Sequence, residues 1–173
     1  MKKLRRADRD ILLWIQNHIR NRYATVFWKI MTALGNLGIL WVAVCAILWF
    51  MPQYKRTAEA ALISLVSCTV IISLILKPIF HRVRPYDKHE VLVPLIPHPK
   101  DLSFPSGHTG ASFSCAVVFL LRLPVPLGLL FVFLAALIAF SRMYLGVHYL
   151  TDIAVGAGVG IFCAICSSCL IPG

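Results

Sequence analysis

Charged residues are scarce in this sequence, and acidic ones are the scarcest. Of the 173 residues, 14% are charged, with 7 Asp and Glu against 17 Lys and Arg, which gives a formal net charge of +10. Soluble domains carry about 25% charged residues, whereas 59% of this chain is hydrophobic. Disordered chains are polar and highly charged, so that class is excluded. The positive charge does not indicate a soluble nucleic-acid-binding domain, because one small soluble core could not bury this much apolar surface.

Cysteines are few, and their surroundings do not suggest disulfides. Free cysteines in apolar surroundings behave as small hydrophobic residues, so we expect all six to be buried packing residues. A metal cluster formed by the three C-terminal cysteines is the alternative, although no fourth soft ligand lies nearby in the sequence. The six, each within an apolar run, are Cys45, Cys68, Cys115, Cys163, Cys166 and Cys169.

Long runs without Asp, Glu, Lys or Arg predict the architecture. A membrane-spanning helix needs about 20 mostly apolar residues, and five runs approach this length. The sequence therefore predicts an all-α polytopic membrane protein, with residues 1–173 forming a single membrane-embedded domain. The five expected transmembrane helices cover residues 30–51, 58–78, 105–121, 124–141 and 149–170.

The N-terminal segment, residues 1–24, has a different pattern. Ile11, Ile15 and Ile19 recur every four residues, while Arg9 and Asp10 lie on the other side of the expected helix. This pattern predicts an amphipathic helix that lies in the membrane interface rather than crossing it. An ordinary soluble helix is the alternative, but the sequence leaves no soluble domain for it to pack on.

Residues 79–103 form the one long polar connection. Prolines recur through it and exclude a regular helix over most of its length, so we expect an active-site loop. Its His and acidic residues could suggest a divalent metal site, but their spacing fits no ligand pattern. We therefore expect no metal or other cofactor. The residues considered are His81, Asp87, His89, Glu90, His98 and Asp101.

Three polar clusters, at residues 77–85, 103–108 and 141–152, interrupt the apolar pattern at the ends of the expected spans. Ionisable residues at such places are costly and usually functional. Successive membrane helices alternate in direction. The end of the second span, the start of the third, the end of the fourth and the start of the fifth must therefore share one face, so the topology brings the three clusters together.

The cations of these clusters predict an anion site. Lys77, Arg84 and Arg142 have no comparable set of acids near them in the sequence, so burying them together requires an anion. A phosphate suits guanidinium forks and an ammonium point charge. Ser106 is placed to cap the third span, and Gly107 lets free backbone amides approach the same anion. The alternative is that these basic residues only anchor helix ends at lipid headgroups.

Two histidines accompany these cations. His148 and Asp152 are four residues apart and share a helix face. A carboxylate that holds one ring nitrogen leaves the other free to attack, which is the arrangement of a nucleophile and its orienting partner. His108 is then available to protonate a leaving group. Each histidine could instead be a satisfied structural residue, but two of them beside three cations favour catalysis.

Three motifs resemble a known family. Lys77-x6-Arg84-Pro85, Pro105-Ser106-Gly107-His108 and Ser141-Arg142-x5-His148-x3-Asp152 are similar to the signature of the type-2 phosphatidic acid phosphatase superfamily. The resemblance implies metal-free hydrolysis of a lipid phosphate or pyrophosphate through a phosphohistidine. Implied substrates are undecaprenyl pyrophosphate, phosphatidate or phosphatidylglycerol phosphate. A lipid phosphotransferase and a non-catalytic anion-binding membrane module are the alternatives.

The resemblance also implies roles for individual residues. His148 attacks phosphorus, Asp152 orients it and His108 protonates the leaving group. The other motif residues hold the phosphate oxygens. The family usually has six core helices, and we expect residues 1–24 to stand in for the first. The phosphate-binding residues are Lys77, Arg84, Ser106, Gly107 and Arg142.

The side of the membrane is indicated in two conflicting ways. With five spans, the N-terminal segment and the active-site face share one side, and most of the Lys and Arg residues lie there. The positive-inside rule places that side in the cytoplasm. The resemblance implies the extracytoplasmic face of the cell membrane, where bacterial relatives generally act, and we take that face as the expectation.

Overall fold

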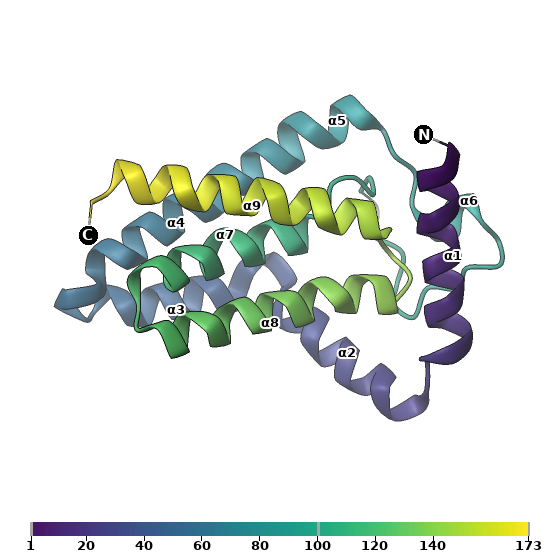
Figure 1. Cartoon of the computed structure of the whole chain (residues 1–173), viewed down its shortest axis with the longest axis horizontal. Coiled ribbons are helices and arrows are strands. Elements are labelled where there is room, and N and C mark those ends of the chain that lie inside the picture. Colours follow the sequence, from purple (N-terminus) through teal and green to yellow (C-terminus); the bar gives the residue numbers. More distant parts are fainter. Residues whose placement is uncertain (1, 100, 173) are drawn as a thin grey trace.

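All regular structure in the described residues, 2–99 and 101–172 of this computed structural model, is helical. The helices form a bundle with α1 lying across one of its ends, while the C-terminus lies at the opposite end (Figure 1). The α-helices are α1 (Lys2–His18), α2 (Arg22–Leu34), α3 (Ile39–Trp49), α4 (Lys55–Val70), α5 (Lys77–Phe80), α6 (Pro85–Lys88), α7 (Gly107–Arg122), α8 (Val125–Tyr144) and α9 (Leu150–Leu170).

Within the described residues, three stretches are long and apolar enough to cross a membrane: Pro52–Lys88, Val125–Tyr144 and Leu150–Leu170. A fourth is added if α2 and the segment Asn36–Trp49, which meet at a bend of 48°, form one span. The expected span 105–121 is α7, whose 16 residues fall short of the usual length. It packs among α4, α8 and α9. The structure thus supports three or four spans, and the number five stays a prediction.

The expected span 30–51 is wrong as one continuous helix. The chain bends after α2, and the bend passes through Leu37 and Gly38, whose φ angles are +52° and +68°. Gly35 is required here by space, because a Cβ would lie 2.7 Å from Cγ2 of Ile138 and 3.0 Å from Cδ2 of His108. The bend therefore brings the α2–α3 junction against α7.

The expected helix over residues 1–24 is also shorter in the structure. Residue 1 lies outside the described residues, and α1 ends at His18. Asn21 begins α2 as its N-cap, with its side-chain oxygen accepting a bond from the Ala24 amide over 2.8 Å. Because Asn21 starts a second helix, the amphipathic pattern of α1 does not continue to residue 24. The location of α1 in the membrane interface stays a prediction.

The expected span 58–78 is part of a longer helical stretch, which contains a wider, π-helical turn. It comprises α4, a π-helical turn over Ile71–Leu76, and α5. Pro78 follows this turn, and because proline has no N–H the regular hydrogen-bond ladder cannot run through it. The helix stops at His81, which adopts φ +43°. Lys77 is held at this irregular end.

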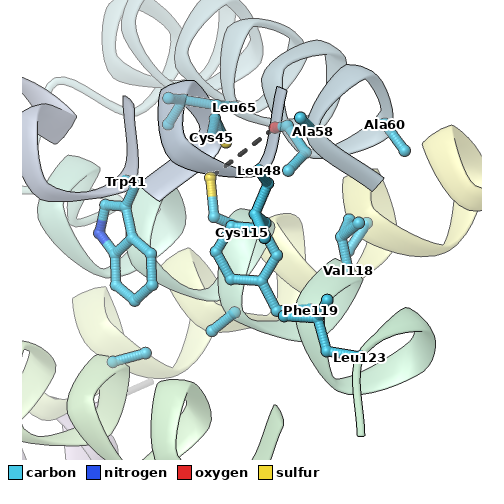
Figure 2. Packing of buried hydrophobic residues seen from close by; sticks show 14 of the residues in the cluster. Trp41, Cys45, Leu48, Ala58, Ala60, Leu65, Cys115, Val118, Phe119 and Leu123 are labelled. Carbon is cyan, nitrogen blue, oxygen red and sulfur yellow. Dashed lines mark hydrogen bonds between the residues drawn. The ribbon is translucent and has the colours of Figure 1, made fainter. Parts of the chain in front are cut away.

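A hydrophobic core between α3, α4 and α7 holds the bundle together (Figure 2). The side chains of Trp41, Cys45, Cys115 and Phe119 are fully buried there. Many apolar residues on the outside of the bundle are exposed instead, among them Phe162 at 62%. Large exposed apolar surface of this kind suits contact with lipid.

Four of the six cysteines are buried, as expected: Cys45, Cys68, Cys115 and Cys163. The prediction is wrong for Cys166 and Cys169, which are exposed on α9. Both lie near the C-terminal end of this apolar helix, where lipid rather than protein would surround them.

Glycines let α7 and α9 approach closely. A Cβ on Gly160 would lie 2.5 Å from the carbonyl oxygen of Gly110, and one on Gly156 would lie 2.7 Å from that of Ser106. Gly158 faces open space. The tight contact fixes the start of α9 against the start of α7, which is where the three polar clusters meet.

Candidate active site

The three polar clusters meet at one end of the bundle, as the topology predicted. A cavity of about 510 Å³ lies there, between the α2–α3 bend, α4, α7 and the α8–α9 turn. Ser106 and Asp152 do not line the cavity but are next to residues that do: Ser106 precedes Gly107, and Asp152 lies 3.5 Å from His148. The predicted site residues that line the cavity are Lys77, Arg84, Gly107, His108, Arg142 and His148.

Local backbone features place the cations and His148. Arg84 precedes Pro85, which begins α6 and forces the extended backbone before it. Arg142 lies in the last turn of α8. His148 lies in the turn between α8 and α9, which passes through Gly146 at φ +76°. This positive φ favours glycine, and a Cβ on Gly146 would also lie 3.3 Å from the carbonyl oxygen of Val93.

Asp101 is the residue that sequence reasoning placed wrongly. The cations were expected to have no comparable acid, yet Nζ of Lys77 contacts Asp101 Oδ2 and Nη2 of Arg84 donates to Oδ1 over 2.7 Å. Partial burial alone would raise the pKa of Asp101, but the contacts with Lys77 and Arg84 outweigh it and hold the pKa well below its ordinary range. Proximity in the sequence could not reveal this pairing, because Asp101 reaches the site from the proline-rich loop.

Arg142 retains capacity to bind an anion. Arg142 is buried, with 3% of its surface exposed, and its Nη1 donates to Oγ1 of Thr32 on α2. Within the described part of the chain, Nε of Arg142 has no hydrogen-bond partner. A buried guanidinium with an unused donor is costly unless an anion accepts from it. Arg142 lines the cavity, so a group that enters the cavity can reach this side chain.

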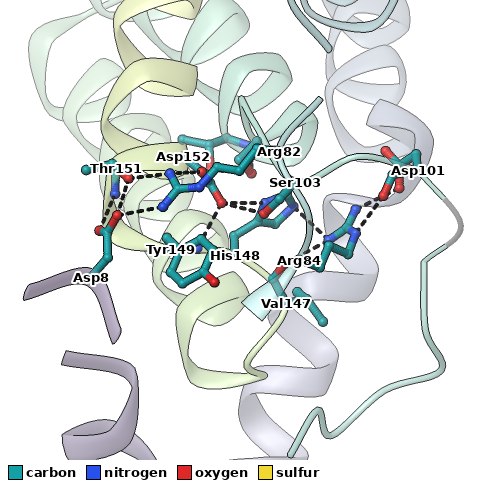
Figure 3. Close-up of polar contacts among 12 residues, drawn as sticks. Asp8, Arg82, Arg84, Asp101, Ser103, Val147, His148, Tyr149, Thr151 and Asp152 are labelled. Atoms are coloured by element: carbon teal, nitrogen blue, oxygen red, sulfur yellow. Dashed lines mark hydrogen bonds and ion pairs between the residues drawn. The ribbon is translucent and has the colours of Figure 1, made fainter. Parts of the chain in front are cut away.

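His148 lies between Arg84 and Asp152 (Figure 3). Its Nδ1 is 3.5 Å from Asp152 Oδ2, and its Nε2 is 3.4 Å from Nη1 of Arg84. The Asp152 contact does not form a hydrogen bond, and Nδ1 has no partner among the described residues. Complete burial and then the nearby charges of Arg142 and Arg84 lower the pKa of His148 well below its usual value. The imidazole is therefore neutral at physiological pH, with Nε2 on the cationic side.

Asp152 is held by the backbone and by the loop. Its Oδ2 accepts the Tyr149 amide over 2.9 Å, as part of a capping box at the start of α9, and Oγ of Ser103 over 2.6 Å. The second oxygen, Oδ1, accepts from Arg82 over 2.6 Å. These contacts fix the carboxylate beside His148.

His108 lies in the first turn of α7, and Ser106 directly precedes this helix. Ser106 is the N-cap of this helix, as predicted, and its Oγ accepts from the hydroxyl of Thr109 over 3.0 Å. A Cβ on Gly107 would meet nothing within 4 Å, so the backbone there is open toward the cavity. Nε2 of His108 is 2.9 Å from Oδ1 of Asn36 on the α2–α3 bend. Sequence reasoning missed Asn36, although an Asn between two glycines in an apolar run was a signal.

The described residues contain no group of three or more His, Cys, Asp and Glu side chains placed to hold a metal ion. Two of the residues considered for such a site have other contacts. His98 stacks on the ring of Tyr86 with centroids 4.5 Å apart, and Asp101 joins the cations.

Fold and site together define an all-helical membrane protein with a cationic, histidine-containing pocket at one end of its bundle. The sequence model of the PAP2 superfamily matches residues 58–172, and the chain belongs to this superfamily. The resemblance drawn from the three motifs is thereby confirmed.

Individual relatives agree with this assignment. The chain is 31% identical over 129 residues to an undecaprenyl-diphosphatase of Sulfolobus acidocaldarius, covering 73% of this chain and 62% of that protein, less than two thirds of its length. It is 30% identical over 150 residues to phosphatidylglycerophosphatase B of Bacillus subtilis, covering 77% and 70%. The crystal structure of Aquifex aeolicus LpxE is similar with a TM-score of 0.82 and 29% identity, over 91% of this chain and 92% of that one.

Proposed function

We propose that the protein is an integral membrane phosphatase that hydrolyses a lipid-linked phosphate or pyrophosphate without a metal ion. The observation that carries this proposal is the joint placement of buried cations and His148 around one cavity. Arg142 retains an unused donor there, and the neutral imidazole presents Nε2 beside Arg84. An anion-binding pocket with a nucleophile inside it suits phosphoryl transfer.

The first step of the mechanism forms a phosphohistidine. Lys77, Arg84, Arg142 and the Gly107 amide bind the phosphoryl oxygens and stabilise the charge of the transition state. Nε2 of His148 attacks phosphorus, and the bond from phosphorus to the leaving oxygen breaks. His108 donates a proton to that oxygen.

The second step regenerates the enzyme. His108, now neutral, takes a proton from water, and the resulting hydroxide attacks the phosphohistidine. The phosphorus–nitrogen bond breaks, inorganic phosphate leaves and His148 returns to its neutral form. Throughout both steps Asp152 orients His148 and stabilises the positive charge that the ring acquires.

A lipid substrate suits the other wall of the cavity. Leu65, Ile72 and Ala111 line it on the side of α4 and α7, next to the α2–α3 bend. A phosphate can therefore bind the cations while an acyl or prenyl chain continues over apolar surface. The names of the relatives support a polyprenyl pyrophosphate or phosphatidylglycerol phosphate as substrate, and phosphatidate has the same headgroup chemistry.

We further propose that the active site faces the extracytoplasmic side. Several basic residues at this end have structural partners, which weakens their value as topology signals: Arg20 donates to backbone carbonyls and Arg82 pairs with carboxylates. A Lys88→Cys variant, with Cys166 and Cys169 replaced by Ala, tests the proposal by labelling intact cells with an impermeant maleimide. Labelling is expected, and protection until the cells are opened would reverse the orientation.

Phosphate release by the purified protein in detergent, with chelator present, tests the function. We expect turnover of undecaprenyl pyrophosphate, phosphatidate or phosphatidylglycerol phosphate, and loss of it in His148→Ala. His18→Ala, which changes an exposed histidine at the end of α1, is the matched control. Transfer of phosphate to a second lipid would identify a phosphotransferase. Phosphate binding without turnover would identify an anion-binding module.

A further inference from the structure

An ion-pair network with two buried carboxylates connects α1 to Asp152 (Figure 3). Arg82 is its centre: Nη1 donates to Asp152 Oδ1 over 2.6 Å and Nη2 donates to Asp8 Oδ2 over 2.8 Å. The side chains of Asp8 and Asp152 are 3% and 0% exposed. Two buried carboxylates therefore share one guanidinium.

Asp8 also fixes the start of α9. Its Oδ1 accepts the Thr151 amide over 3.1 Å and its Oδ2 accepts the Thr151 hydroxyl over 2.5 Å. The same hydroxyl accepts from Arg82 over 2.6 Å. Asp8, from a helix at the other end of the sequence, thus satisfies an amide in the first turn of α9.

Arg82 is held from a second direction by the ring of Tyr149, whose centroid lies 4.1 Å from the guanidinium carbon. Oδ2 of Asp152 accepts hydrogen bonds from Ser103 and from the Tyr149 amide, and Oδ1 accepts one from Arg82. Both carboxylate oxygens therefore have hydrogen-bond partners. His148 Nδ1 lies 3.5 Å from Oδ2. A small rotation of the carboxylate would change that distance directly.

Neither Asp8 nor Arg82 is among the described residues that line the phosphate cavity. Both therefore act on a reaction there indirectly, and their hydrogen bonds lead to Asp152 and Thr151. Arg82 also occupies a variable position of the first motif, between Lys77 and Arg84, so the motif assigns it no role.

We infer that Asp8 and Arg82 are positioning residues, through which α1 holds Asp152 in the orientation that His148 requires. This inference rests on the proposed function. It makes α1 part of the catalytic apparatus, in addition to any contact with the membrane surface. Because the described side-chain contacts of Asp8 and Arg82 include no residue that lines the phosphate cavity, their replacement should affect the rate of phosphoryl transfer and leave phosphate binding unchanged.

Steady-state kinetics of Asp8→Asn, Asp8→Glu and Arg82→Lys test this inference. We expect Asp8→Asn to lower kcat about tenfold, a typical cost for disturbing a residue behind the reacting groups, with KM and inhibition by inorganic phosphate within about twofold. Asp8→Glu should recover part of the loss, because it keeps the charge. Asp10→Asn, which removes an exposed carboxylate of α1 that pairs with its neighbour Arg9, is the matched control and should behave as the wild type.

A double-mutant cycle with Asp152→Asn, measured by release of radiolabelled phosphate, separates positioning from general stability. If Asp8 acts through Asp152, Asp8→Asn should change the residual rate of Asp152→Asn by no more than about twofold. An equal tenfold loss in both backgrounds, or a loss that follows a lower unfolding temperature, would overturn the inference. Arg82→Lys provides the same comparison if Asp8→Asn does not fold.

The two proposals fail in different ways. An active His148→Ala variant would refute the proposed function. An inactive His148→Ala variant together with an unchanged kcat in Asp8→Asn and Arg82→Lys would refute only the positioning role.

Discussion

Arg84 holds Asp101 at two points, with Nη2 donating to the carboxylate over 2.7 Å and Nε donating to the backbone carbonyl over 2.8 Å. The carboxylate also contacts Lys77, and the Asp101 side chain is 54% exposed. A carboxylate offers a guanidinium the same pair of oxygens that a phosphate offers. In the proposed function, Asp101 therefore occupies donors that a substrate phosphate would use.

Replacing Asp101 with Asn should strengthen anion binding. A half-exposed ion pair stabilises by at most about 1 kcal/mol, equivalent to about fivefold in affinity. We expect Asp101→Asn to lower KM and the inhibition constant of inorganic phosphate by up to this factor. Asp87→Asn, which removes an exposed carboxylate of the short helix α6, should leave both constants unchanged. A higher inhibition constant in Asp101→Asn would show that Asp101 assists binding instead of competing with it.

The pH dependence of kcat/KM should report the neutral state of His148. The attacking ring must be unprotonated, and its pKa is lowered from 6.5 by burial and by nearby cations. The reactive form therefore persists below pH 6.5 and is lost only as the pH falls through the lowered pKa. After correction for ionisation of the substrate, the acid midpoint should lie below 6.5. A midpoint at or above 6.5 would contradict this environment for His148.

The contact between His108 and Asn36 should matter most for poor leaving groups. His108→Ala removes the proton donor, and Asn36→Ala removes the partner 2.9 Å from its Nε2. An alkoxide needs protonation more than a phenolate does. Both variants should therefore lose more activity on an alkyl phosphate than on an aryl phosphate, with His108→Ala the more severe. Equal losses on both substrates would argue against a general-acid role.

Two glycines of α9 provide a matched test of helix packing. A Cβ at Gly160 would lie 2.5 Å from the carbonyl oxygen of Gly110 and 2.9 Å from the amide of Ser114, whereas one at Gly158 meets nothing within 4 Å. Gly160→Ala should reduce stability by about 1–3 kcal/mol because backbone must move. Gly158→Ala should be neutral or slightly stabilising. Thermal unfolding in detergent measures both, and equal midpoints would contradict the close α7–α9 contact.

The meeting of the three motif regions could be predicted from the sequence, because alternating helices leave little freedom in which ends share a face. The capping role of Ser106 was also readable from residue type and position. The bend at Gly35 was missed because glycine and asparagine also occur inside apolar spans. Without that bend, Asn36 could not be placed beside His108.

The contacts of Asp8 and Asp101 could not be predicted. Asp8 and Arg82 are 74 residues apart, and an amphipathic pattern does not distinguish a buried aspartate from a solvated one. Asp101 lies in a loop whose prolines remove any periodicity. Its return to Lys77 depends on three-dimensional loop geometry, which spacing alone does not specify.

The most direct measurement is rapid quenching of a single turnover with substrate labelled in its phosphoryl group, followed by peptide mapping. A phosphohistidine intermediate predicts acid-labile, base-stable label on Nε2 of His148, and no labelled protein in His148→Ala. Phosphate release that proceeds at the normal rate without labelled protein would contradict it, as would label on another residue.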